Sequence, residues 1–372
     1  MPRRARTRRP KGLAGIPEEI LQEILVRLPA KSVLRCRAVC RSWRRLISDP
    51  AFLAAHHRHR PTLSLVGSFR AAKDDFYPEH LDAVDLQGAE VRPVFNPTRY
   101  CWVDASCDGL IVIGGHICNP ATRQWVPLGR NASGARIMGL YRHPPSEEYR
   151  VLFWCRGDST FPTDVYCPIE YRILTVGSDK PRRITFSVTP VEEELIGAPD
   201  PTFIGAPVLL HGKLHLHWNK SRRNGGYHKI LVFDTVAESF RHMRPPSVNP
   251  RHVMQLFDMD GKLAASCSKD AMVEMRIFAL QDYESEVWSF QYRIKLPVVE
   301  IRRFQEQGDW LAKIVSEEGD LLVSCFGWLL HCDRKDNLLA KFQYDDDLPM
   351  VIPHRYKESL IQHSFFEKKR KD

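Results

Sequence analysis

Residues 108–128 of this 372-residue chain, DGLIVIGGHICNPATRQWVPL, decide the fold of its larger part. A turn signal, DG, directly precedes the apolar run 110–113, and a second turn begins at Asn119-Pro120 and ends before Trp125. We expect the first turn to start a strand near the axis of a radial fold and the second turn to join two outer strands. The Trp125 ring is then expected to pack between neighbouring sheets.

Degenerate copies of this pattern recur along the chain. They open on Gly109, Gly212, Gly261 and Gly319, and the second copy continues to Asp234. If the interval between the first two glycines contains one weakly marked copy, the period is about 50 residues, which suits a four-stranded propeller blade. A region of about 300 residues then holds about six blades.

Short apolar runs with an alternating pattern extend this interpretation over the region beyond residue 60. They predict strands at 110–113, 150–154, 171–176, 213–218 and 229–233, and Asn224-Gly225-Gly226 is a hairpin signal between the last two. No long amphipathic helix is expected between residues 61 and 340. The sequence therefore predicts an all-β region.

The first 60 residues have helical periodicity instead. Pro17 suits the first turn of a helix, and the apolar positions Ile20, Leu21, Ile24, Leu25 and Leu28 then form one stripe. Two further helices are predicted from about Lys31 and from Arg41 towards Asp49-Pro50. Three short helices bury too little surface to be stable alone, so this unit is expected to dock on the rest of the chain or on a partner.

Residues 16–21, 24–35 and 39–52 resemble an F-box, with Ile16 where the family usually has Leu and Arg41 where Lys is frequent. The resemblance implies binding to a Skp-family adaptor, which links such proteins to a cullin-based ubiquitin ligase. The positions that would form or support that interface are Ile16, Pro17, Ile20, Leu28, Pro29, Val39, Cys40 and Trp43. The alternative, that Trp43 and the leucines only close a three-helix core, stays open at this point.

Residues 107–110 and 118–125 resemble plant F-box proteins that carry an F-box-associated β-propeller, and Gly114-Gly115 with Trp125 resembles a kelch-type blade. This implies a two-domain α+β chain: a small three-helix F-box followed by a propeller of about six four-stranded blades. The expected segments are a basic tail (1–13), the F-box module (14–54), a linker (55–62), the propeller (63–352) and a C-terminal tail (353–372). The residues expected to shape the blades are Gly109, Asn119, Pro120, Trp125, Gly212, Asp234 and Gly261.

The formal net charge of +9 is unevenly distributed. The excess of Lys and Arg lies in residues 1–60 and 367–372, whereas residues 61–366 are mildly acidic, which argues against a nucleic-acid-binding body. The basic termini are either nuclear-import signals or solvated tails. No apolar run suits a membrane span or a secretory signal, so we expect a cytoplasmic or nuclear protein.

The sequence contains few of the motifs that indicate catalysis or metal binding. No C-x-x-C occurs, so the ten cysteines are expected to be small buried residues, and the signatures G-x-S-x-G, G-x-G-x-x-G and H-E-x-x-H are absent. His211, His215 and His217 lack a completing zinc ligand, and strand histidines facing solvent are the simpler explanation. No catalytic residue, metal or cofactor is therefore expected.

Three functions remain at this point. The first is a non-catalytic target receptor of a ubiquitin ligase, in which the F-box binds the adaptor and the propeller binds an unknown target protein. The second is an interaction scaffold that does not act in a ligase. The third is a propeller enzyme or small-ligand binder, which a deep polar pocket at the propeller axis would favour.

Overall fold

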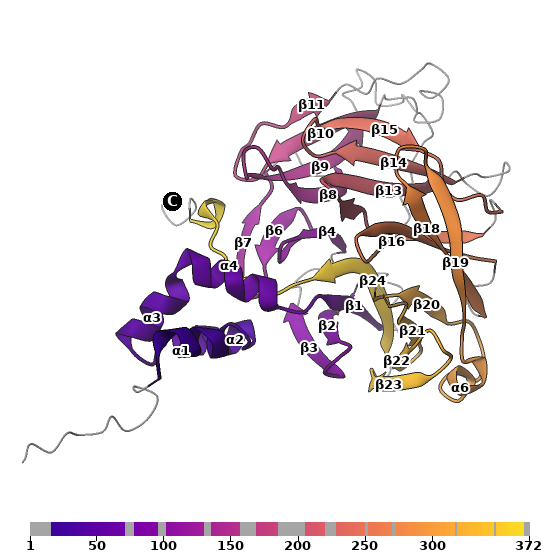
Figure 1. The fold of residues 1–372 in the computed structure, drawn as a ribbon, viewed down its shortest axis with the longest axis horizontal. Coiled ribbons are helices and arrows are strands. Elements are labelled where there is room, and N and C mark those ends of the chain that lie inside the picture. Colours follow the sequence, from indigo (N-terminus) through magenta and orange to yellow (C-terminus); the bar gives the residue numbers. More distant parts are fainter. Residues whose placement is uncertain are drawn as a thin grey trace, which may run out of the picture.

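The computed structural model describes residues 16–70, 78–95, 102–129, 135–156, 169–184, 205–219, 228–249, 252–269, 273–316, 318–345 and 347–367. Within these residues a group of helices precedes a β-propeller, and Figure 1 shows the helices together at one side of it. The predicted basic tail 1–13, the hairpin turn 224–226 and the basic residues after Glu367 lie outside the described residues.

Residues 16–60, the described part of the N-terminal unit, contain four helices, so the prediction of three was wrong. They are α1 (Glu18–Leu25), α2 (Ala30–Cys36), α3 (Arg41–Ser48) and α4 (Pro50–His59). Asp49-Pro50 ends α3 but also begins α4, because Asp49 Oδ1 accepts hydrogen bonds from the N–H groups of Ala51 and Phe52 at 2.8 and 3.2 Å. As a result, α4 covers residues 55–59 of the segment that we expected to be a linker.

In the part of the chain that the structure describes, six sheets of four antiparallel strands form the propeller, as predicted, and we name them blades A to F. Blade A comprises β24 (Asp347–Tyr356), β1 (Leu63–Arg70), β2 (His80–Asp85) and β3 (Glu90–Phe95), and blade B comprises β4 (Val103–Cys107), β5 (Leu110–Ile113), β6 (His116–Asn119) and β7 (Gln124–Pro127). Blade C comprises β8 (Arg136–Arg142), β9 (Tyr149–Arg156), β10 (Ile169–Thr175) and β11 (Arg182–Ile184), and blade D comprises β12 (Val208–Leu210), β13 (Lys213–Asn219), β14 (His228–Asp234) and β15 (Ser239–Met243). Blade E comprises β16 (Val253–Met259), β17 (Lys262–Ser268), β18 (Glu274–Asp282) and β19 (Val287–Lys295), and blade F comprises β20 (Leu311–Ile314), β21 (Leu321–Cys325), β22 (Trp328–Cys332) and β23 (Leu338–Gln343).

The last strand of the chain closes the ring. β24 pairs with β1 along the whole of β1, from Leu63 opposite Tyr356 to Arg70 opposite Asp347. Blade A therefore combines the first three strands of the propeller with its last one. Between blades E and F the chain also forms the short helix α6 (Val298–Arg302).

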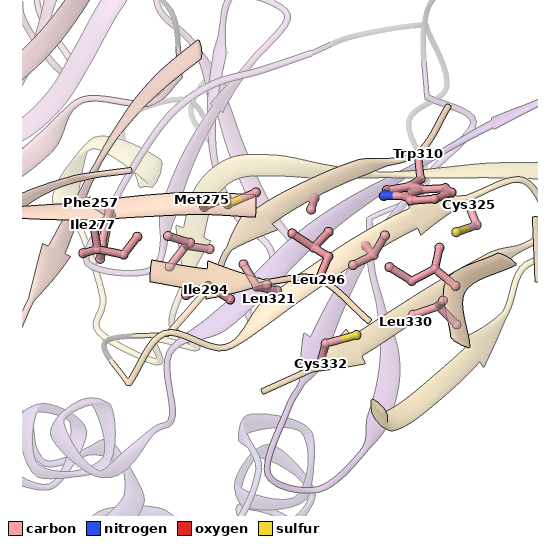
Figure 2. Close-up of a cluster of buried hydrophobic side chains, with 14 of the residues drawn as sticks. Phe257, Met275, Ile277, Ile294, Leu296, Trp310, Leu321, Cys325, Leu330 and Cys332 are labelled. Atoms are coloured by element: carbon pink, nitrogen blue, oxygen red, sulfur yellow. The ribbon is translucent and has the colours of Figure 1, made fainter. Parts of the chain in front are cut away.

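The apolar cores of the propeller lie between blades rather than within them. Each of the six seams has its own buried cluster, and a separate cluster fills the helical unit. Figure 2 shows the cluster at the seam between blades E and F, in which Ile294 of blade E lies beside Leu321 of blade F. Burial at every seam explains why a ring of sheets is stable although each sheet has two apolar faces.

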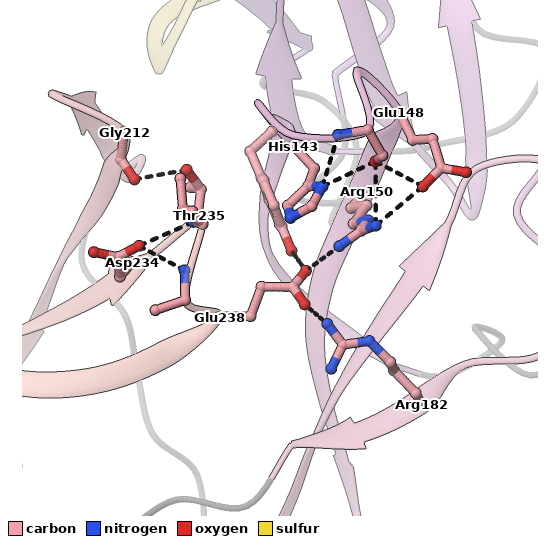
Figure 3. A network of polar contacts seen from close by, with 12 residues as sticks. His143, Glu148, Arg150, Arg182, Gly212, Asp234, Thr235 and Glu238 are labelled. Carbon is pink, nitrogen blue, oxygen red and sulfur yellow. Dashed lines mark hydrogen bonds and ion pairs between the residues drawn. The ribbon is translucent and has the colours of Figure 1, made fainter.

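A polar network supplements the apolar seam between blades C and D (Figure 3). Glu238, in the turn after β14, accepts hydrogen bonds from Tyr141 Oη and Arg150 Nη1, both at 2.7 Å, and pairs with Arg182. Glu286 occupies the corresponding turn of blade E and binds Arg241 of blade D at 2.8 Å. Glu238 therefore ties blade D to blade C, and Glu286 ties blade E to blade D.

The glycine repeat marks one particular turn of the blade. Gly109, Gly212 and Gly261 have φ of +84°, +69° and +73°, and the residue before each also has a positive φ, so each pair forms a tight hairpin turn of the kind that glycine favours. Each turn joins the innermost strand to the second strand. The weakly marked copy is blade C, where residues 143–148 join β8 to β9.

The second turn of the repeat joins the third and fourth strands, as predicted. Asp234 Oδ1 accepts hydrogen bonds from the N–H groups of Val236 and Ala237, both at 2.9 Å, and Asn119 Oδ1 accepts one from Ala121 at 3.1 Å. Pro120 follows Asn119 and its carbonyl accepts a hydrogen bond from the N–H of Arg123. These side chains therefore fix the turn through their own backbone.

Two predictions about side-chain direction were wrong. The Trp125 ring is 67% exposed and contacts the His116 ring in a tilted arrangement, with ring centroids 5.1 Å apart, whereas its neighbour Val126 is buried in the seam between blades B and C. Successive strand residues face opposite sides, so the seam position belongs to Val126. His215 and His217, expected to face solvent, are buried, and they bind Tyr283 Oη and His228 at 2.8 and 3.0 Å.

Candidate functional site

The eight residues predicted to contact an adaptor all keep accessible surface. Pro17, Ile20, Val39 and Cys40 are exposed, with Ile20 53% and Val39 60% exposed, and Ile16, Leu28, Pro29 and Trp43 are partly buried. Of the second group, Ile16, Leu28 and Trp43 pack against the core of the helical unit. Each of the two alternatives, adaptor surface or three-helix core, therefore fits some of these residues. Trp43 and Leu28 contribute to the core, whereas Ile20 and Val39 contribute little to it.

One exposed residue of this surface was not predicted. Ile24 is 46% exposed and lies one helical turn after Ile20 on α1. The sequence placed Ile24 in the apolar stripe without assigning it to the adaptor surface, and the buried face of α1 is formed by Leu21 and Leu25. The signal for Ile24 is its spacing of four residues from Ile20, which puts both side chains on one face.

A C-terminal strap, residues 357–366, joins the helical unit to the propeller. Leu360 is 3% exposed and belongs to the buried cluster of the helices, together with Leu25 and Ile47. Glu358 Oε2 accepts a hydrogen bond from the N–H of Ala30 at 3.1 Å and lies 3.9 Å from Arg60 Nη1. Figure 1 shows this part of the chain beside α4.

The α4 helix contributes further polar contacts to the strap. A ring nitrogen of His57 lies 3.0 Å from the Glu358 carbonyl oxygen, and Lys357 Nζ donates a hydrogen bond to the Arg58 carbonyl at 3.1 Å. His56 is buried beneath them, and desolvation lowers its pKa below the usual value. Backbone carbonyl groups of both α4 and the strap thus accept hydrogen bonds from the other segment, which holds the strap against α4.

Blade B holds the other side of the strap. Asn119 Nδ2 donates a hydrogen bond to the Ser359 carbonyl at 3.0 Å, and both residues are buried. A Cβ atom on Gly109 would lie 2.5 Å from Ser359 Cβ and 2.6 Å from the Lys357 carbonyl oxygen. Gly109 and Asn119, predicted only as blade residues, therefore also form the surface on which the strap packs.

The strap and the helices occupy the end of the propeller at which the inner strands finish. Gly109 follows the inner strand β4, and Asn119 ends β6, which runs in the same direction because each strand is antiparallel to the next. The opposite end of the ring, where β4 and β8 begin, is distant from these contacts.

Described residues of the inner strands line two cavities along the propeller axis. One, of about 350 Å³, is lined by residues of the inner strands β4, β12, β16, β20 and β24, among them Ser106, Gln255, Lys313 and His354. The other, of about 510 Å³, lies at the beginning of the inner strands and includes Trp102, Asp104, Arg136 and Trp154. Ile352, Pro353 and His354 line both cavities, so the two adjoin.

Burial controls the charge of three axial groups. It raises the pKa of Asp104 to about 6, lowers that of Lys313 to about 8 and lowers that of His354 to about 4. At neutral pH His354 is therefore neutral and Lys313 is charged. Within the described residues no group of three or more His, Cys, Asp or Glu side chains is arranged to hold a metal ion.

No helix of the described residues is long and apolar enough to cross a membrane. The described cysteines are free thiols, and Cys118, Cys267, Cys325 and Cys332 are buried. Burial raises the pKa of Cys267 and Cys332 to about 12, so these thiols stay protonated.

Comparisons with known proteins agree with the geometry. A family model described as an F-box associated β-propeller domain matches residues 89–346, and an F-box-like model matches residues 13–59. The F-box protein CPR1 of Arabidopsis thaliana is 26% identical over 316 residues, which are 77% of this chain and 74% of that protein. The F-box protein At5g18160 of the same plant is 26% identical over 381 residues, covering 93% of this chain and 87% of that protein.

Proposed function

The chain belongs to the family of F-box proteins with an F-box associated β-propeller domain, and from this premise we propose that it is the target-binding subunit of a cullin-type ubiquitin ligase. The F-box binds a Skp-family adaptor and, through it, the cullin. The propeller binds a target protein in the cytoplasm or nucleus. The chain itself has no catalytic step and acts by holding the target close to the ubiquitin-charged enzyme.

The observation that carries the adaptor-binding proposal is the set of exposed apolar side chains on the helical unit. Ile20, Ile24 and Val39 are each about half exposed or more, although the helices and Leu360 of the strap already form a buried core. Exposed apolar residues of this kind are typical of a surface that a partner covers.

The strap supports the positioning role. Because it binds both the helices and blade B, the adaptor surface and the propeller are held in one orientation. A target bound at the other end of the axis, near Trp102 and Arg136, then lies at a fixed distance from the cullin. Trp102 is 39% exposed there, and aromatic and arginine side chains are frequent anchors in protein interfaces.

Co-purification with a Skp-family adaptor tests the adaptor surface. We expect the double variant Ile20→Asp with Ile24→Asp to lose binding, because two carboxylates would be buried without partners. Val287→Asp, on β19 of blade E, is the matched control, since Val287 is 50% exposed and lies outside the helical unit. Adaptor binding that survives the double variant would show that this surface is not the interface.

The same purification distinguishes the role of ligase subunit from the role of scaffold. A ligase subunit recovers the cullin together with the adaptor, whereas a scaffold recovers the adaptor alone. Target binding is tested by comparing the proteins captured, with ubiquitin transfer blocked, by the natural chain and by Trp102→Ala with Arg136→Glu. A protein captured by both forms equally would not bind at this end of the axis.

A further inference from the structure

The axial cavity of about 350 Å³ contains an unusual positive charge. Lys313 lies on the inner strand β20, and its ammonium group donates one hydrogen bond to the Val351 carbonyl at 2.6 Å. An ammonium group has three N–H donors. Among the described residues no carboxylate oxygen lies within 4.0 Å of Lys313 Nζ.

Burial of the charged Lys313 ammonium group in this cavity is unfavourable in free energy. Removing an ammonium group from water is unfavourable unless a counter-charge or several hydrogen bonds replace the solvent. Burial accordingly shifts the pKa of Lys313 down to about 8, and desolvation is the cause of the shift. Because the group is still protonated at neutral pH, a partly buried cation faces the cavity without an anion next to it.

The acidic residues of the cavity wall have other partners. Asp258 Oδ1 accepts a hydrogen bond from the N–H of Gly261 at 2.9 Å, and Asp108 Oδ2 accepts one from Tyr149 Oη at 3.0 Å. The Asp258 carboxylate therefore binds within the turn that ends β16, whereas the Asp108 carboxylate links blade B to Tyr149 of blade C. Arg355 adds a second positively charged side chain to the wall.

Neutral hydrogen-bonding groups accompany the cation. His354 lies on the adjoining strand β24 and lines both axial cavities, and burial, together with the charge of Lys313, lowers its pKa to about 4. A neutral imidazole and the Gln255 amide can each donate a hydrogen bond to an oxygen atom. The Lys313 ammonium group together with these neutral donors suits an oxyanion.

We propose that this axial cavity is a binding site for an anionic group, a carboxylate or a phosphate, with Lys313 Nζ as its charged partner. The cavity has the volume of a typical small-molecule site and is enclosed by inner strands of five blades. A free organic acid and an acidic side chain of a bound protein offer the same chemistry. The site does not depend on the ligase role, because none of its groups belongs to the F-box.

Calorimetric titration of the full chain tests the site and distinguishes the two sources. The probes are citrate, inorganic phosphate and a short glutamate-rich peptide, each at a constant ionic strength set with NaCl. We expect saturable binding of at least one probe, weakened tenfold or more in Lys313→Met. The control Lys262→Met removes an exposed lysine of β17 and is expected to leave binding unchanged.

The pattern of probes assigns the source. Binding of citrate or phosphate indicates a free small acid, and binding of the peptide alone indicates an acidic protein side chain. The proposal is overturned if no probe binds saturably or if Lys313→Met binds as the natural chain does. Without any anion, Lys313→Met is expected to melt at or above the temperature of the natural chain, and a lower melting temperature would show that the ammonium is a structural group instead.

Discussion

Replacing Gly109 by alanine isolates the contribution of the strap to the structure. Gly109 has φ +84°, and an added Cβ would lie 2.5 Å from Ser359 Cβ and 2.6 Å from the Lys357 carbonyl oxygen. Gly261 occupies the same turn of blade E with φ +73°, but an added Cβ there meets nothing within 4 Å. The two variants share the cost of alanine in a left-handed conformation and differ in the clash with the strap.

The structure gives the expected magnitudes. A non-glycine residue in the left-handed region costs about 1–2 kcal/mol, which is the whole effect expected for Gly261→Ala. In Gly109→Ala the strap has to move, so the hydrogen bond from Asn119 to Ser359 and the burial of Leu360 are lost as well. These add about 1 and about 2 kcal/mol, for a total of about 4–5 kcal/mol.

Urea unfolding of both variants measures the free-energy differences, and amide hydrogen exchange locates them. We expect faster exchange in residues 357–366 and in α4 for Gly109→Ala, and unchanged exchange there for Gly261→Ala. Equal losses of stability, or exchange in the strap that stays slow in Gly109→Ala, would refute the conclusion that blade B holds the strap.

Three further predictions concern the buried and exposed side chains. Leu360→Ala should cost about 2–4 kcal/mol in urea unfolding, because Leu360 fills the core of the helices, and a loss below about 1 kcal/mol would contradict that packing. Trp125→Ala should change the free energy of unfolding by less than about 1 kcal/mol, because the ring is 67% exposed; a loss of several kcal/mol would mean that the ring is buried in solution. The stability contributed by the neutral His215 and His354 should be full above pH 6.5 and be lost as the pH drops towards 4, since burial lowers the pKa of both to about 4 and the unfolded chain takes up protons near pH 6.5. Each histidine accounts for about 3 kcal/mol at pH 4, and urea midpoints that do not change between pH 7 and pH 4.5 would contradict this.

The features predictable from the sequence are those encoded by neighbouring residues. A positive φ at Gly109, Gly212 and Gly261 needs a glycine or a small polar residue, so the turns of the blades were visible as a repeat. The F-box was visible because its helices are defined by apolar spacing and by prolines. The fourth helix was missed because Asp-Pro is both a helix end and a helix start.

Contacts between distant segments had no such local signal. Glu358 binds the backbone of Ala30, and Ser359 binds Asn119, across most of the length of the chain. Nothing in the sequence near Glu358 distinguishes these residues from a solvated tail. The prediction for the Trp125 side chain failed for a related reason. The side of the sheet that a side chain faces depends on the register of its strand, and a shift of one residue moves the side chain to the opposite face.

The closing strand and the strap are continuous in sequence, and this couples the two domains. β24 completes blade A by pairing with β1, and the chain then passes directly into the residues that bind α2 and α4. Separating β24 from β1 would therefore open the ring and also loosen the contacts between the strap and the helices. Because one segment does both, the closed ring and the docking of the helices depend on the same residues, and in the proposed ligase role a partly unfolded chain would not hold a target at a fixed distance from the cullin.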